Sequence, residues 1–150
     1  MNSEPSALAA VSAPRSALLL GFAGVVPFIG LTVAITMRGD WLLAERAFAY
    51  YSALILSFLG GIRWGVVGTQ LERRGRDLLL SVLPSLVAWI ALLGGDFYTR
   101  LAVLMLGHLL TAVTDGLIPP RGQFLWLRTL RLQLSGLVLV THAILLTVLL

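Results

Sequence analysis

Five long apolar stretches constrain this chain more than any other feature of its sequence. They are Ala17 to Met37, Ala47 to Gly68, Leu78 to Gly94, Leu101 to Ile118 and Leu130 to Leu150. A helix needs about 17–25 apolar residues to cross the hydrocarbon core of a bilayer, so each stretch is long enough to span a membrane. None carries the charged stripe that a helix of a soluble bundle presents to water. The sequence therefore predicts an all-α integral membrane protein, a bundle of five transmembrane helices.

The composition agrees with this prediction. Hydrophobic residues make up 58% of the 150 residues, and charged residues make up 12%. A soluble domain of this size has too little interior to hide so many apolar side chains, whereas a bilayer solvates them directly. We expect one transmembrane domain, residues 17–150, after a short disordered tail, residues 1–16. Because short links join the spans, consecutive helices are expected to be antiparallel neighbours.

The distribution of arginine predicts the orientation of the helices. The basic residues are all arginines, and they flank the spans instead of forming one patch, so we expect the lipid bilayer as a partner and no nucleic acid. Three lie on one side, Arg38, Arg46 and Arg100, and seven on the other, Arg15, Arg73, Arg74, Arg76, Arg121, Arg128 and Arg131. Short arginine-rich loops stay in the cytoplasm. The amino terminus is therefore expected in the cytoplasm and the carboxyl terminus outside.

Two segments of the second and third spans resemble a known family. Residues 51–65 read YSALILSFLGGIRWG and residues 81–89 read SVLPSLVAW, and Asp115 and a link rich in Pro, Arg and Trp follow. This pattern is similar to the domain-of-unknown-function family shared by proteobacterial inner-membrane proteins and the animal mitochondrial transmembrane protein 69. The resemblance covers about residues 18–149. It implies a multi-pass protein of the bacterial inner (cytoplasmic) membrane, and it implies no activity.

Small residues recur every four positions along the second span, at Ala49, Ala53, Ser57, Gly61, Gly65 and Thr69. Such a face lets two helix backbones approach closely, and in lipid this close packing replaces the hydrophobic drive that associates helices in water. We expect the face to pack against another span of the same chain. A membrane-protein partner or a second copy of the chain is the alternative. Pro27 and Pro84 are expected to interrupt or kink the first and third spans.

Arg63 and Asp115 are charged residues inside predicted spans. A charge at the centre of a span costs about 3 kcal/mol or more. The second and fourth spans run in the same direction, which brings both residues to a similar depth near the cytoplasmic side. We expect the guanidinium to hold the carboxylate in a structural ion pair with parallel hydrogen bonds. The alternatives are an arginine that extends to the headgroups, an aspartate at the interface, and a functional charge site.

Two histidines are expected near the middle of the bilayer. His108, Thr111 and Asp115 share one face of the fourth span, and Arg131, Ser135 and His142 share one face of the fifth, because spacings of three, four and seven return to the same side of a helix. The two polar faces are expected to meet, since lipid would leave them unsatisfied. They indicate hydrogen bonds between helices, a proton relay from His142 through His108 to Asp115, or axial ligation of a b-type haem.

The sequence contains no common catalytic motif. It has no cysteine, which excludes thiolate metal sites, iron–sulfur clusters and disulfides, and it has no glycine-rich phosphate loop or zinc-protease motif. The expected function is a non-enzymatic accessory, assembly or structural subunit of a membrane complex, without metal or cofactor. One alternative is a small oligomeric proton-coupled carrier or conductance that uses the intramembrane His, Asp and Arg side chains. The other is a haem- or quinone-binding electron carrier.

Overall fold

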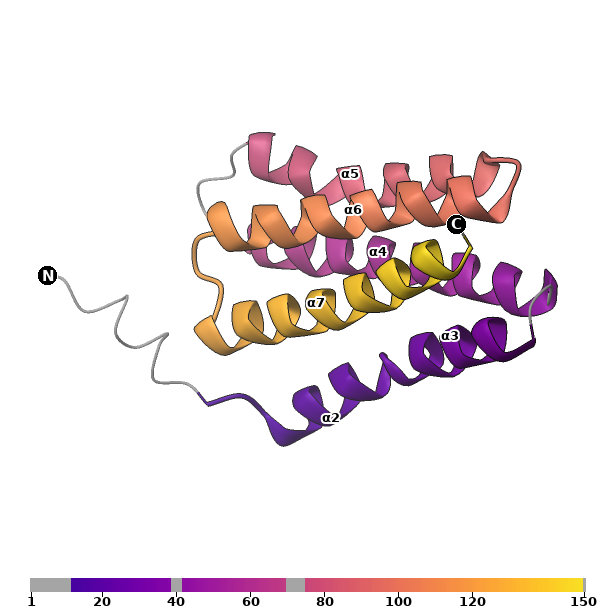
Figure 1. Ribbon diagram of the computed structural model, residues 1–150. Helices are drawn as coiled ribbons and strands as arrows, with labels where there is room; N and C mark the ends of the chain where they lie inside the picture. The colour runs from indigo at the N-terminus through magenta and orange to yellow at the C-terminus, as the bar shows by residue number, and fades with distance from the viewer. Residues whose placement is uncertain (1–11, 39–41, 70–74, 150) are drawn as a thin grey trace, which may run out of the picture.

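The computed structural model describes residues 12–38, 42–69 and 75–149. Its elements are α2 (Arg15–Ala23), α3 (Val26–Arg38), α4 (Leu42–Gly68), α5 (Gly75–Leu93), α6 (Phe97–Leu117) and α7 (Leu125–Val148) (Figure 1). Helices α2 and α3 form one span, Arg15–Met37, and with the other four elements they give five helices long and apolar enough to cross a membrane. The predicted all-α bundle of five such helices is confirmed. Of the tail predicted to be disordered, residues 1–11 lie outside the described residues, and Arg15 and Ser16 belong to α2.

All five spans begin before the apolar stretches that predicted them. Helix α4 begins at Leu42 instead of Ala47, and α6 begins at Phe97 instead of Leu101. The length of an apolar stretch corresponds only to the part of a helix inside the hydrocarbon core. The additional turns contain polar residues because the helix continues beyond that core into the headgroup region. Asp96 caps the start of α6, since its carboxylate accepts hydrogen bonds from the backbone N–H of Thr99 at 2.8 Å and from its hydroxyl at 2.7 Å.

The first span is broken at Gly24 and Val25, between α2 and α3. Pro27 is the second residue of α3, and at the start of a helix the missing N–H leaves no hydrogen bond unmade. In a continuous helix, residue 27 would have to donate an N–H to the carbonyl of Ala23, and proline has none to donate. The interruption therefore lies just before the proline. The hydroxyl of Tyr51 in α4 donates to the Gly24 carbonyl at 2.8 Å and satisfies one group at the break. Pro84 lies inside α5, which continues past it.

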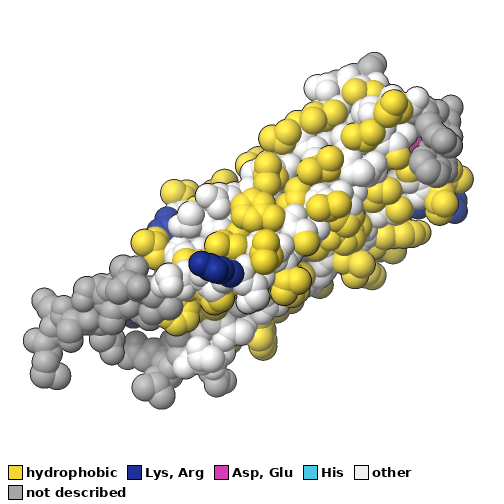
Figure 2. All heavy atoms as spheres, turned by 90° about the horizontal axis from the view of Figure 1, so that it is seen from below, with side chains coloured by type: hydrophobic (Ala, Val, Ile, Leu, Met, Phe, Trp, Pro, Cys, Tyr) yellow, Lys and Arg dark blue, Asp and Glu magenta, His cyan; other side chains and the backbone are white. Residues whose placement is uncertain are grey.

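Helix α4 lies in the middle of the bundle and packs against α3, α5 and α6, while α7 packs against α6, α3 and α2. Two clusters of buried side chains fill the bundle. One contains Phe28, Ile35, Phe48, Leu101, Val138 and Leu145 from four helices, and the other contains Ala49, Ala53, Leu56, Ala88, Ala91 and Leu104. Large apolar side chains also cover the outside. Figure 2 shows them along the face seen from below, with arginines toward the two ends.

Gly60, and not the predicted glycine face, brings α4 into close contact with another helix. A Cβ atom on Gly60 would lie 2.5 Å from the carbonyl oxygen of Ser81, so α4 and α5 touch through their backbones there. Gly61 and Gly65 are exposed, and a Cβ on either would meet no atom within 4 Å. The prediction that these two glycines pack inside the chain is therefore wrong. One residue rotates a helix by about 100°, which turns Gly61 outward when Gly60 faces α5.

Candidate functional site

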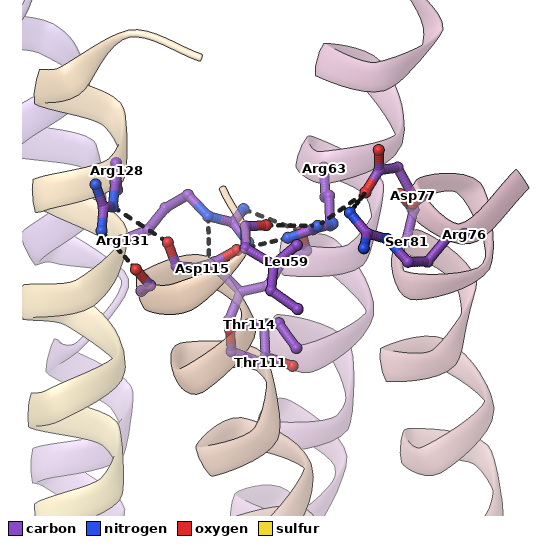
Figure 3. Close-up of polar contacts among 12 residues, drawn as sticks. Leu59, Arg63, Arg76, Asp77, Ser81, Thr111, Thr114, Asp115, Arg128 and Arg131 are labelled. Atoms are coloured by element: carbon purple, nitrogen blue, oxygen red, sulfur yellow. Dashed lines mark hydrogen bonds and ion pairs between the residues drawn. The ribbon is translucent and has the colours of Figure 1, made fainter. Parts of the chain in front are cut away.

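The carboxylate of Asp115 in α6 lies between two guanidinium groups. Its Oδ2 atom is 2.7 Å from Nη2 of Arg131 and accepts a hydrogen bond from Nε of the same residue at 2.9 Å. Its Oδ1 atom accepts a longer bond, 3.5 Å, from Nη1 of Arg63 (Figure 3). The structure thus brings Arg63 and Asp115 together as the sequence predicts, but Arg131 of α7 is the closer partner. Two short contacts from one guanidinium are the geometry of a strong charge-assisted pair.

Both arginines also bind backbone carbonyls of neighbouring helices. Nη1 of Arg131 donates to the carbonyl of Leu59 in α4 at 3.0 Å. Nη2 of Arg63 donates to the carbonyl of Ile118, at the end of α6, at 2.8 Å, and lies 3.6 Å from Oδ1 of Asp77 in α5. The charge cluster, defined as Arg63, Asp77, Asp115 and Arg131, therefore connects α4, α5, α6 and α7.

Three of the four side chains in the charge cluster are buried, and the cluster carries no net charge. Arg63, Asp115 and Arg131 are 3%, 1% and 2% exposed, and the two guanidiniums balance the two carboxylates. A buried charge left without a partner is costly, whereas a paired and hydrogen-bonded group avoids most of that cost. Arg128 lies beside the cluster and donates to the carbonyls of Asp115 and Gly116, which satisfies acceptors that the end of α6 leaves open.

A second polar group, the histidine–serine row, joins His108 of α6, Ser52 of α4 and His142 of α7. The hydroxyl oxygen of Ser52 lies 3.1 Å from Nε2 of His108 and 2.9 Å from Nε2 of His142. All three side chains are fully buried. Phe28 and Phe48 pack against the row, with ring centroids 5.9 Å and 4.9 Å from that of His142.

The hydrogen bonds of the row fix its proton positions when both imidazoles are neutral. Nδ1 of His142 lies 2.8 Å from the carbonyl of Val138, which only accepts, so Nδ1 carries the proton and Nε2 accepts. The single hydroxyl proton of Ser52 then goes to His142, and the serine oxygen accepts from Nε2 of His108. Nδ1 of His108 is left as a buried acceptor without a hydrogen-bond partner among the described residues.

The charge cluster and the histidine–serine row are separate. His108 and Asp115 are seven residues apart on α6, which is about 10 Å along its axis. Thr111 lies between them, but its hydroxyl donates to the carbonyl of Gly107 in its own helix at 2.8 Å. Ser135 lies between Arg131 and His142 on α7, and its hydroxyl makes no hydrogen bond within the described residues. The predicted relay from His142 through His108 to Asp115 thus lacks a side-chain link between its last two members.

The position of Ser52 between the two imidazoles of the histidine–serine row conflicts with ligation of a haem by both histidines. An iron held by both Nε2 atoms would take the place of the Ser52 hydroxyl, which lies within hydrogen-bond distance of each. Ligation of a haem would therefore require Ser52 to leave and the packed rings of Phe28 and Phe48 to separate.

Sequence reasoning missed Ser52, Asp77 and the role of Arg131. Ser52 is a polar residue in the middle of an apolar span, and that position alone indicates a buried partner. Asp77 falls one residue before the predicted third span, although it belongs to the first turn of α5. Arg131 was placed on the correct face of α7 but not paired, because a helical face does not specify which residue of the neighbouring helix it meets.

Comparison with known proteins agrees with the predicted resemblance. Transmembrane protein 69 of Xenopus tropicalis is 41% identical over 99 residues, which are 63% of this chain and 39% of that protein. Transmembrane protein 69 of Mus musculus is 38% identical over 88 residues, which are 55% of this chain and 36% of that protein. The chain thus matches less than two fifths of the length of these curated relatives. No solved structure matches it. Residues 13–147 match the family described as protein of unknown function (DUF3429), and the chain belongs to that family.

Proposed function

We propose that this chain is a non-enzymatic accessory, assembly or structural subunit of a membrane complex, located in the bacterial inner membrane with its amino terminus in the cytoplasm. The charge cluster is the observation that carries the proposal. A group that moves protons or ions must exchange its partner and must meet water. Arg63 and Arg131 are instead held by Asp115 and by the carbonyls of Ile118 and Leu59. This arrangement supports a structural role for the charges, which hold four helices together.

The outer surface of α4 supports a role in assembly. Gly61 and Gly65 are exposed, without a neighbour within 4 Å of an added Cβ. Next to them lies a shallow groove of about 370 Å³ between α4 and α5, whose walls include Ala53, Ser57 and Ala88. Small side chains let another backbone approach closely in lipid. We expect a transmembrane helix of another subunit to pack on this surface.

Native gel electrophoresis of mildly solubilised membranes tests this role. The wild-type chain should migrate in a complex larger than one copy, and Gly61→Leu should reduce the size of that complex. Gly136→Leu in α7 is the matched control, because Gly136 is also exposed and has no neighbour within 4 Å of an added Cβ. A wild-type chain that migrates alone, or two variants that behave alike, would contradict the proposal.

Crosslinking identifies the neighbour in the same membranes. The chain has no cysteine, so Gly61→Cys and Gly136→Cys each carry a single thiol. A product formed from Gly61→Cys and absent from Gly136→Cys is expected, and mass spectrometry of that product names the partner. If the crosslinked product consists of two copies of this chain, the surface of α4 mediates self-association and does not bind a different subunit.

The proton-coupled conductance remains the second candidate, and the histidine–serine row is the observation that favours it. Two imidazoles joined by one hydroxyl form a short path along which a proton can pass. Proton uptake by vesicles that contain the purified protein tests this function. Proton uptake that depends on the protein and disappears in the Ser52→Ala variant would favour the proton-coupled conductance over the accessory role. A visible spectrum of the same sample tests the haem-binding alternative.

A further inference from the structure

A cavity of about 370 Å³ lies between α2, α4 and α7, and Arg131 of the charge cluster forms part of its wall. Its walls are almost entirely apolar and include Leu20, Phe28, Ile55, Phe58, Leu130 and Leu134. This volume is within the range of sites that bind small molecules, which are mostly apolar with a few polar groups that orient the ligand. The cavity plays no part in the accessory role proposed above.

The shape of the cavity fits a long molecule from the bilayer. Along α7 it extends from Trp126 to Val138, which is about 18 Å at 1.5 Å per residue. The hydrocarbon core of a bilayer is about 30 Å thick, so the cavity is about as long as one leaflet is deep. Helix α2 forms one wall and buries no residue of its own. Figure 1 shows α2 at the edge of the bundle, and two residues of the cavity wall, Leu20 and Phe58, are 74% and 64% exposed, so the cavity borders lipid on that side.

Two polar groups in the cavity walls have no partner among the described residues. They are the hydroxyl of Ser135, a residue that is 1% exposed, and the indole N–H of Trp126. The buried hydroxyls of Ser81 and Thr141 donate to carbonyls of their own helices, those of Asp77 and Val138. Ser135 does not, so its proton is available to a ligand.

The remaining polar group of the wall, Arg131, is already neutralised by Asp115. A charged ligand would therefore find no counter-ion in the cavity. The unpartnered groups are hydrogen-bond donors, and a donor needs an acceptor such as a carbonyl oxygen. The ligand chemistry that fits is a long apolar chain with a neutral carbonyl group.

We propose that the cavity between α2, α4 and α7 binds one neutral membrane lipid whose apolar chain lies along the helices and whose carbonyl oxygen accepts a hydrogen bond from Ser135 or Trp126. Two kinds of membrane lipid share this chemistry. An acylglycerol has ester carbonyls at the interface, near Trp126 at the start of α7, whereas a quinone carries carbonyls on a ring that reaches Ser135, about 13 Å deeper along α7.

Lipid analysis of the protein purified in mild detergent is the first test. Wild-type protein should retain about one lipid of a single class per chain. Ala17→Phe, which adds a ring at the cavity wall, should retain at least tenfold less. Ala23→Phe is the matched control, because Ala23 lies on the same helix, is exposed and does not line the cavity. Equal retention in both variants, or wild-type protein that carries only the bulk lipid mixture, would overturn the proposal.

Titration with two probes separates the two lipid classes and does not depend on the folding of Ala17→Phe. The probes are dioctanoylglycerol and a decyl-benzoquinone, and the measurement is the rise in melting temperature of the purified protein. Loss of one buried hydrogen bond weakens binding about fivefold to tenfold. We expect Ser135→Ala to weaken the quinone, or Trp126→Phe to weaken the glyceride, by this factor, and Ser81→Ala to weaken neither. If neither probe raises the melting temperature, or if both substitutions leave binding unchanged, no such site exists.

Discussion

Replacement of Asp115 by leucine is expected to be one of the two most destabilising single changes in the charge cluster. It removes the carboxylate that both guanidiniums share and leaves Arg131 with only the Leu59 carbonyl. Removal of one member of a buried ion pair costs about 3–5 kcal/mol, because the other charge stays behind without a partner. Arg131→Leu is expected to fall in the same range, since Asp115 then keeps only its 3.5 Å contact with Arg63.

Arg63→Leu is expected to be milder, at about 1–3 kcal/mol, because it removes hydrogen bonds but leaves no unpaired carboxylate. Asp115 retains both close contacts with Arg131, at 2.7 and 2.9 Å. The double variant of Asp115 and Arg131 should lose about 2–3 kcal/mol less than the sum of its single variants, because no isolated charge remains. The double variant of Asp115 and Arg63 should show a smaller difference.

Unfolding in mixed micelles, followed by helix content as dodecyl sulfate is added, measures these free energies. Arg76→Leu is the control: Arg76 is 60% exposed and 3.7 Å from Asp77, so its loss should change stability by less than about 1 kcal/mol. An Arg63→Leu variant that loses as much as Arg131→Leu would refute the assignment of Arg131 as the main partner. Strictly additive losses in both double variants would refute the ion pairs themselves.

Three further predictions follow from the topology, the helix contacts and the cap of α6. A reporter that works only in the cytoplasm should be active when fused after Arg128 and silent after Leu150, and the opposite pattern would reverse the orientation. Gly60→Ala should lower the melting temperature, because its Cβ would lie 2.5 Å from a backbone oxygen of α5, while Gly61→Ala should not; equal effects would contradict the close contact. Hydrogen bonds from the next turn hold the pKa of Asp96 below its ordinary value of 3.8, so its contribution to stability should be present at neutral pH and disappear as the pH falls below that value. Asp96→Ala should lack that part of the pH dependence, and identical stability curves for both proteins would show that the cap contributes nothing.

The sequence was sufficient for the number of spans and for the proximity of Arg63 and Asp115. Apolar length specifies where a helix crosses the hydrocarbon, and the direction of the second and fourth spans was enough to place Arg63 near Asp115. It was not sufficient for the rotation of one helix against another. A shift of one residue separates Gly60 from Gly61, and the four-residue repeat of small side chains contains Gly61 but not Gly60.

The same reason explains why the predicted face of polar residues on α7 was correct while its partners were not. Periodicity places Arg131, Ser135 and His142 on one side of a helix. It does not show that Arg131 binds Asp115, that His142 binds Ser52, or that Ser135 faces a cavity. Those outcomes depend on how far each helix is displaced along its neighbour, which is decided by the packing of large side chains such as Phe28 and Phe48.

The pairing of the first and last spans has a consequence for biosynthesis. Helices α4, α5 and α6 contact neighbours in the chain, so each meets a partner soon after it enters the membrane. Helix α2 packs on α7, which the ribosome makes last. During synthesis α2 therefore lacks its contact with α7 while α4, α5 and α6 are inserted. A lipid that lies between α2 and α4 at that stage is covered on one side when α7 arrives, so the cavity can acquire its ligand as the chain is made.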